Sequence, residues 1–154
     1  MKQYFLFIIL LIILPSLSSN EPIPYRLVNA DDLNMQRTHD DTITHLAGNV
    51  HFFYDEIEFL SDRAQIFEQQ QIVILIGNVK VIQDTLTITS EEAHYSHITQ
   101  LLRVERNIVI EQNKDSEIIR RVTANHGNHN RETGDFFLIG LKKQQQIFSY
   151  EIVV

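Results

Sequence analysis

The side chains that could do chemistry in this 154-residue chain are histidines and carboxylates, with 7 His, 20 Asp plus Glu and no Cys. His126 and His129 lie three apart in an Asn-rich run, but residues at that spacing on a strand point to opposite faces. The acidic pairs Asp31-Asp32, Asp40-Asp41 and Glu91-Glu92 likewise place one carboxylate on each side of a strand. The sequence has no H-E-x-x-H, G-x-S-x-G, P-loop or dinucleotide motif. We therefore expect no enzyme, no cofactor and no metal site, with calcium ligation at a loop tip left open.

Composition and charge exclude further classes. Lys plus Arg total 13 against 20 Asp plus Glu, a net charge of −7, so we expect no nucleic-acid partner. The absence of Cys removes disulfide scaffolds and lipobox anchoring, while 44% hydrophobic residues suffice for the core of one domain. The charge is uneven: residues 20–77 hold 3 basic and 10 acidic side chains, and residues 78–154 hold 9 and 10.

The first 19 residues have the layout of a secretory signal peptide. Lys2 gives a positive start, the apolar run 4–14 follows, and Ser16 and Ser18 form a small-x-small cleavage site. As a helix that run spans about 16 Å, roughly half of a membrane's hydrocarbon core. We predict a cleaved signal peptide over residues 1–19 and one domain over residues 20–154, with a retained anchor as the alternative.

The rest of the chain repeats itself in steps of 29 residues. Residues 46–50 (LAGNV) recur as 75–79 (LIGNV), and the next step falls on 106–108 (RNI). Residues 61–64 (SDRA) recur as 90–93 (SEEA) at the same spacing. Such a period predicts one supersecondary unit stacked in series, each unit burying its apolar face against its neighbours.

Later copies depart from this step. A degraded copy at residues 138–142 (LIGLK) is shifted by 34 residues. About five extra residues must therefore lie near 113–117, and we expect them at a hairpin tip, where insertion is tolerated.

Each unit reads as a pair of antiparallel strands. Apolar and polar residues alternate with period two, as at Val50/Phe52 and Val79/Val81. Turn residues separate the runs at 55–56, 83–85, 113–116 and 128–134, and we expect the glutamine triplets 69–71 and 144–146 in turns as well. We predict an all-β fold of nine or ten strands, a folded-over sheet such as a jelly roll or half-barrel with one apolar interior.

The Gly-Asn positions of the repeat are expected to form bulges or corners, where positive φ is tolerated. Arg106 stands where the other copies have glycine. We therefore expect the corner not to require a positive φ.

Six segments of the chain together carry a family resemblance. They are residues 27–33 (LVNADDL), 46–50, 59–64, 75–81, 86–95 and 106–110. With the N-terminal segment, this pattern resembles the OstA-like family, which includes the LptA-type periplasmic proteins of lipopolysaccharide transport. The resemblance implies a β-jellyroll whose V-shaped trough is lined by apolar side chains. It also implies that acyl chains lie in the trough with the headgroup outside, and that domains stack edge strand to edge strand.

The resemblance and the alternation together give candidate site residues. The predicted trough lining is Val50, Phe52, Phe59, Ile74, Ile76, Val79, Val81, Leu86, Ile88, Ile108 and Ile110. Ordinary sealed core is the other interpretation of each of these residues. The candidates for headgroup contact, in the nearly neutral half of the chain, are Arg103, Arg106, Arg120 and Arg121.

The predicted function is a periplasmic bridge that carries lipopolysaccharide from the inner to the outer membrane without catalysis. Its expected partners are lipopolysaccharide and other jellyroll-domain transport proteins, with self-assembly left open. One alternative is a docking subunit of the exporter anchored in the inner membrane. Another is a structural β-repeat protein of the envelope with a sealed core.

Overall fold

The fold is described from a computed structural model, which describes residues 25–115, 117–140 and 143–146. These residues form ten strands, as the sequence predicts. The strands are β1 (Tyr25–Asn29), β2 (Asp32–Arg37), β3 (Thr42–Tyr54), β4 (Ile57–Phe67), β5 (Ile72–Gln83), β6 (Leu86–Ser96), β7 (Leu101–Lys114), β8 (Glu117–Asn130), β9 (Phe136–Ile139) and β10 (Lys143–Gln146). The described part of the chain contains no helix that could cross a membrane. The predicted signal peptide lies outside the described residues.

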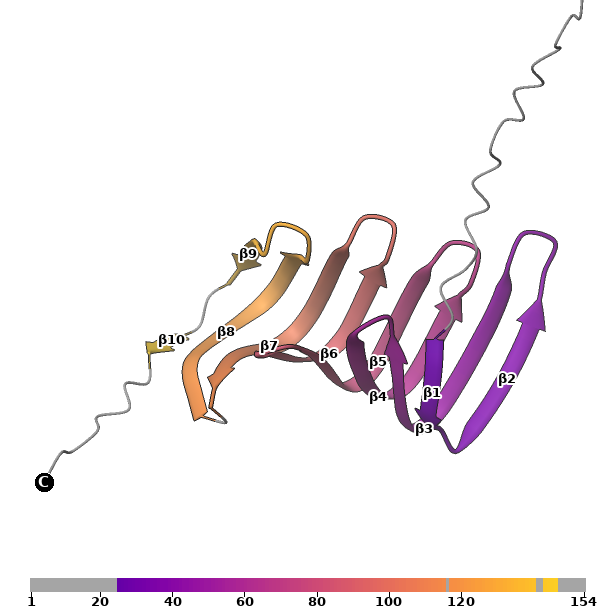
Figure 1. Ribbon diagram of the computed structural model, residues 1–154, viewed down its shortest axis with the longest axis horizontal. Coiled ribbons are helices and arrows are strands. Elements are labelled where there is room, and N and C mark those ends of the chain that lie inside the picture. Colours follow the sequence, from indigo (N-terminus) through magenta and orange to yellow (C-terminus); the bar gives the residue numbers. More distant parts are fainter. Residues whose placement is uncertain (1–24, 116, 141–142, 147–154) are drawn as a thin grey trace, which may run out of the picture.

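All ten strands belong to one antiparallel sheet in the order β1-β3-β4-β5-β6-β7-β8-β10 (Figure 1). At the first edge, β1 pairs with residues 51–54 of β3 and β2 pairs with residues 42–47 of the same strand. At the last edge, β9 and β10 divide β8 between them in the same way. At each edge of the sheet, two short strands therefore take the place of one long strand.

The sheet folds over along a line of pairing interruptions that crosses the long strands, and the repeat corners of β3, β5 and β7 lie on this line. Pairing is interrupted there, for example between Ala47 and Val50 and between Ile76 and Val79. The bends divide the sheet into two layers, which we call jaws. The upper jaw is β2, β9 and residues 42–47, 63–67, 72–76, 92–96, 101–105 and 126–130 of β3–β8. The lower jaw is β1, β10 and the remainder of β3–β8 beyond the bends.

The corners adopt the left-handed backbone in all three copies. Gly48 and Gly77 have φ of 74° and 80°, and Arg106 at the equivalent position has φ of 64°. The expectation that Arg106 removes the need for positive φ is therefore wrong. The two-residue bulge sets the backbone here, and a non-glycine residue adopts it at a cost of about 1 kcal/mol.

The jaws pack against each other to form the core. Phe52 and Phe59 of the lower jaw stack with ring centroids 5.3 Å apart. Phe59 also meets Tyr95 of the upper jaw at 5.7 Å. All three side chains are no more than 1% exposed. Burial of large apolar side chains contributes roughly 1.5–3 kcal/mol each, so this contact between the jaws stabilises the fold.

The predicted turns largely match the connections between strands. Residues 55–56, 69–71 and 84–85 fall between consecutive strands. The other predicted turns overlap strand ends, because Gln83 ends β5, residues 113–114 end β7 and residues 128–130 end β8. The extra residues near 113–117 lengthen the β7–β8 hairpin, whose register shifts between Gln112 and Asn113. The triplet 144–146 is a correction, because it lies in β10 and pairs with residues 120–122 of β8. Pairing with the edge strand β8 satisfies the backbone hydrogen-bonding groups of this triplet. A run of identical glutamines has no alternation of apolar and polar residues, so the sequence does not indicate a strand here.

Candidate functional site

The inner face of the folded sheet carries nine of the eleven residues predicted to line a trough. Eight of them are buried, with exposed fractions of 7% or less: Val50, Phe52, Phe59, Val79, Val81, Ile88, Ile108 and Ile110. Leu86 is half-buried and packs against this core. Cross-strand register aligns Phe52, Phe59, Val81, Ile88 and Ile110 in one row across the lower jaw. The apolar interior is therefore continuous from β3 to β7.

Ile74 and Ile76 require a correction, because the structure places them on the outer face. Ile74 pairs with Gln65 and His94, which share that half-exposed outer row. Val73 and Leu75 take the inner positions instead and are 0% exposed. Residues 72–76 (IVILI) are apolar throughout, so alternation cannot distinguish the two faces here.

The middle of the interior is closed. Ile66, Val73 and Leu75 of the upper jaw are 0% exposed, as are Phe52 and Phe59 of the lower jaw. These side chains contact one another across the fold rather than lining an empty channel. A lipid chain can therefore reach them only if the jaws separate.

Apolar surface remains accessible at the two ends of the sheet. At the first end, Leu33 and Met35 of β2 are 46% and 56% exposed. Their partners are Leu46 and Thr44 on β3, so both belong to inner-face rows. At the last end lies a cavity of about 170 Å³. It is lined by Leu86, Ile110, Gln112, Arg120, Val122, Phe136 and Leu138.

The four arginines predicted to contact a headgroup do not form one cluster. Arg103 is exposed in the row of Ile74 and His94 on the outer face. Arg120 lines the cavity at the last end. Arg121 lies on the outer face of the lower jaw, 3.5 Å from Glu111.

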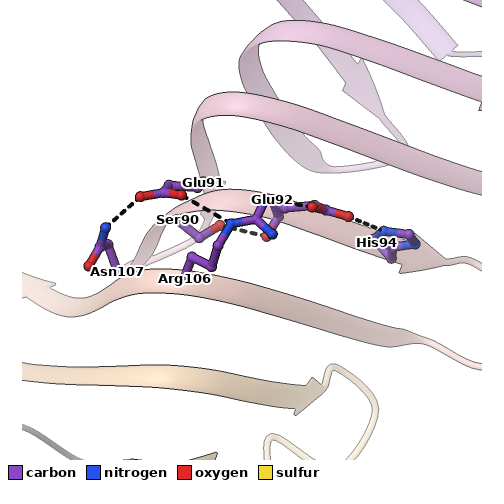
Figure 2. A network of polar contacts seen from close by, with 6 residues as sticks. All are labelled: Ser90, Glu91, Glu92, His94, Arg106 and Asn107. Carbon is purple, nitrogen blue, oxygen red and sulfur yellow. Dashed lines mark hydrogen bonds and ion pairs between the residues drawn. The ribbon is translucent and has the colours of Figure 1, made fainter.

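Arg106 belongs to a polar network at the β6–β7 corner (Figure 2). Its Nε lies 3.0 Å from Glu91 and its Nη2 lies 2.6 Å from Glu92. The hydrogen bonds from His94 and then Arg106 lower the pKa of the Glu92 carboxyl. Arg106, on β7, therefore pairs with carboxylates of the neighbouring strand β6 at the outside of the bend.

A further arginine, which the sequence did not predict as a site residue, bridges the two jaws. Arg131, in the loop between β8 and β9, places its Nη1 3.2 Å from Asp55 Oδ2 in the β3–β4 turn. No local sequence pattern predicts this contact, because the partners lie 76 residues apart and Arg131 lies outside the repeat.

The histidines behave as the strand geometry predicts. His126 is exposed on the outer face, whereas His129 is only 6% exposed on the inner face. Burial lowers the pKa of His129. Across the described parts of the chain, no group of three or more His, Asp or Glu side chains is placed to hold a metal ion.

Comparison with known proteins agrees with this architecture. The crystal structure of LptH from Pseudomonas aeruginosa superposes with a TM-score of 0.66 at 8% sequence identity, covering 82% of this chain and 96% of that chain. It is described as the LptA homologous periplasmic component of the conserved lipopolysaccharide transport device. At this identity the likeness shows a shared β-jellyroll fold. No match is found among curated proteins. The sequence model of the family described as OstA-like protein matches residues 25–135, and the chain therefore belongs to the OstA-like family.

Proposed function

We propose that this protein is a periplasmic carrier that holds the acyl chains of lipopolysaccharide between its jaws and passes the lipid from the inner toward the outer membrane. The observation that carries the proposal is the continuous apolar inner face, which runs across the sheet and stays accessible at both ends. Family membership and the likeness to LptH support it.

The physical requirement is an apolar path through water. Each CH₂ group removed from water contributes roughly 0.8 kcal/mol, so a lipid with several long chains needs a continuous apolar lining. Apolar residues at both ends, Leu33 and Met35 on β2 and Phe136 and Leu138 on β9, extend that lining to the sheet edges. Strand addition at these edges would join it to neighbouring jellyroll domains or to another copy of this chain.

Two other functions remain as alternatives. An uncleaved N-terminal segment would make the protein a docking subunit held at the inner membrane, and N-terminal sequencing of the processed protein distinguishes this from a free carrier. A structural envelope protein with a sealed core is favoured by the 0% exposure of Phe52, Phe59 and Leu75. It differs from the carrier in never exposing these residues to lipid.

Photocrosslinking in Gram-negative cells tests the carrier against the sealed core. A photoreactive amino acid replaces Phe52 or Ile88 on the inner face, and Ile76 on the outer face serves as the matched control. The carrier predicts adducts with lipopolysaccharide from positions 52 and 88, and at least tenfold fewer from position 76. If the folded variants give no adduct from either inner position, or equal yields from all three, the carrier function is rejected.

A further inference from the structure

An ion pair joins the rims of the two jaws. Asp55 lies in the turn between β3 and β4 at the rim of the lower jaw, and Arg131 lies in the loop between β8 and β9 at the rim of the upper jaw. Arg131 Nη1 donates to Asp55 Oδ2 at 3.2 Å. The contact therefore spans the mouth, by which we mean the side of the fold away from the corners, where the two rims meet.

Arg131 is fixed to the upper jaw by several further contacts. Its Nη1 also donates to Gln100 Oε1 at 3.1 Å, and its backbone N–H donates to Gln100 O at 2.9 Å. Its side chain is 14% exposed, whereas that of Asp55 is 40% exposed. If the jaws part, Arg131 stays with the upper jaw and Asp55 leaves with the lower jaw. The guanidinium is then left without its carboxylate.

A buried hydroxyl next to this pair lacks a partner. Tyr54 precedes Asp55 and is 1% exposed, packed against the rings of Tyr95 and His97 at 6.2 Å and 5.6 Å. Its hydroxyl has no hydrogen-bond partner among the residues that the structure describes. A buried polar group without a partner is unfavourable, so the closed arrangement of the rim carries a cost at Tyr54.

We propose that Asp55 and Arg131 form a latch across the mouth, and that the anionic headgroup of a lipid opens it by replacing Asp55 as the counterion of Arg131. The latch rests on the proposed function, because it explains how lipid chains reach an interior whose residues are closed off from water. A phosphate group binds a guanidinium through two parallel hydrogen bonds, which the single contact from Asp55 does not provide. The Tyr54 hydroxyl then gains a polar neighbour at the same rim.

The exposure of Asp55 makes this exchange feasible. Ion pairs that are partly exposed to water contribute little net stability, so breaking the contact between Asp55 and Arg131 costs little free energy. The headgroup stays at the rim beside Arg131, and the acyl chains pass between Tyr54 and Tyr95 into the interior.

Substitution of the two charges tests the latch in the full mature chain, with binding of purified lipopolysaccharide as the readout. Arg131→Gln should weaken binding at least tenfold, and Asp55→Asn should strengthen it several-fold because Arg131 is freed. The matched controls Glu58→Gln, from the His51–Glu58 pair on the outer face, and Arg63→Gln should leave binding within twofold. Inorganic phosphate alone should not displace the bound lipid. Displacement by phosphate would overturn the lipid latch in favour of a free-phosphate site.

A reversible lock across the mouth provides a second test, since the chain has no native cysteine. Cysteines replace Glu56 and Glu132, the exposed neighbours of the latch residues, and a reducible bismaleimide joins them. The control crosslink joins positions 45 and 65, which pair within the upper jaw. The lock should abolish lipopolysaccharide binding until it is reduced, and the control should not. If the unaltered protein binds lipid but neither the lock nor the charge substitutions changes binding, the latch is wrong. If the unaltered protein binds no lipid, the proposed function itself fails.

Discussion

Asn78 Nδ2 donates hydrogen bonds to both carboxylate oxygens of Asp62, at 3.2 Å and 3.0 Å, across the corner between β4 and β5. Asn49 makes the equivalent bond to Asp31 at 2.9 Å, and Asn107 bonds to Glu91. The 29-residue repeat therefore encodes a ladder of amide–carboxylate bonds along the outside of the fold. Each rung ties one bent strand to the next at the point where backbone pairing is interrupted.

Asp62→Ala should lower the free energy of unfolding by about 1 kcal/mol, because one rung loses an acceptor that carries a charge. Chemical denaturation measures this loss directly. Glu56→Ala, at an exposed turn position with no corner role, is the control and should change stability by less than about 0.5 kcal/mol. Equal effects at the two positions would show that the ladder does not support the corners.

Arg106 should reveal the backbone strain at the third corner. Arg106→Gly and Arg106→Ala both remove the ion pairs with Glu91 and Glu92, but only glycine relieves the positive φ of 64°. The glycine variant should therefore be the more stable of the two by about 1 kcal/mol. At Arg103, in the extended part of β7, the order should reverse, since glycine weakens a strand interior. A glycine variant less stable than alanine at position 106 would contradict a strained corner.

Truncation of neighbouring residues on β5 should separate the two faces of the sheet. Leu75→Ala removes a 0% exposed side chain from the contact between the jaws and should cost about 2–5 kcal/mol. Ile74→Ala removes a half-exposed outer side chain and should cost less than about 1.5 kcal/mol. Thermal or urea unfolding of the two variants gives the comparison. Similar losses would mean that the inner face is misassigned.

His129 should make the fold sensitive to mild acid. Burial lowers the pKa of its imidazole below the ordinary 6.5, so the folded protein resists protonation while the unfolded chain accepts it. The free energy of unfolding should therefore be unaffected well above pH 6.5 and fall as the pH drops through 6.5. Replacement by phenylalanine, which can stack on Phe136 as His129 does at 4.0 Å, should flatten the curve between pH 7.5 and 5.5.

The outcome is read from urea unfolding at several pH values. The matched control is His126→Asn, at an exposed position on the same strand. A wild-type slope that survives in His129→Phe would assign the acid sensitivity to another group.

The strand arrangement could be predicted from sequence because the patterns that determine it lie within single repeat units. Period-two alternation gave the strands, turn residues gave the hairpins, and the 29-residue step gave the serial stacking. The face of β5 could not be predicted, because residues 72–76 are apolar on both sides and only pairing with Ala64 and Ala93 places Leu75 inside.

The rim contact and the closed interior could not be predicted because they depend on how the jaws meet. Asp55 resembles an ordinary turn residue, and Arg131 lies in a polar loop outside the repeat. Their pairing follows from the way the bends bring the two jaws together, not from any spacing in the sequence. The buried Asp41 is a similar case: its carboxylate accepts hydrogen bonds from the Gln69 backbone and the Gln70 side chain, both at 2.9 Å and 28 and 29 residues away along the chain.

The most direct test of the account is whether lipopolysaccharide forces the jaws apart. Spin labels on cysteines replacing Gln65 and Thr87 sit on the outer faces of the upper and lower jaws, respectively. Pulsed electron paramagnetic resonance measures the distance between them with and without the lipid. Uptake between the jaws predicts a longer distance on addition of lipopolysaccharide and no change in a protein locked between positions 56 and 132. An unchanged distance in protein that has demonstrably bound the lipid would contradict uptake between the jaws.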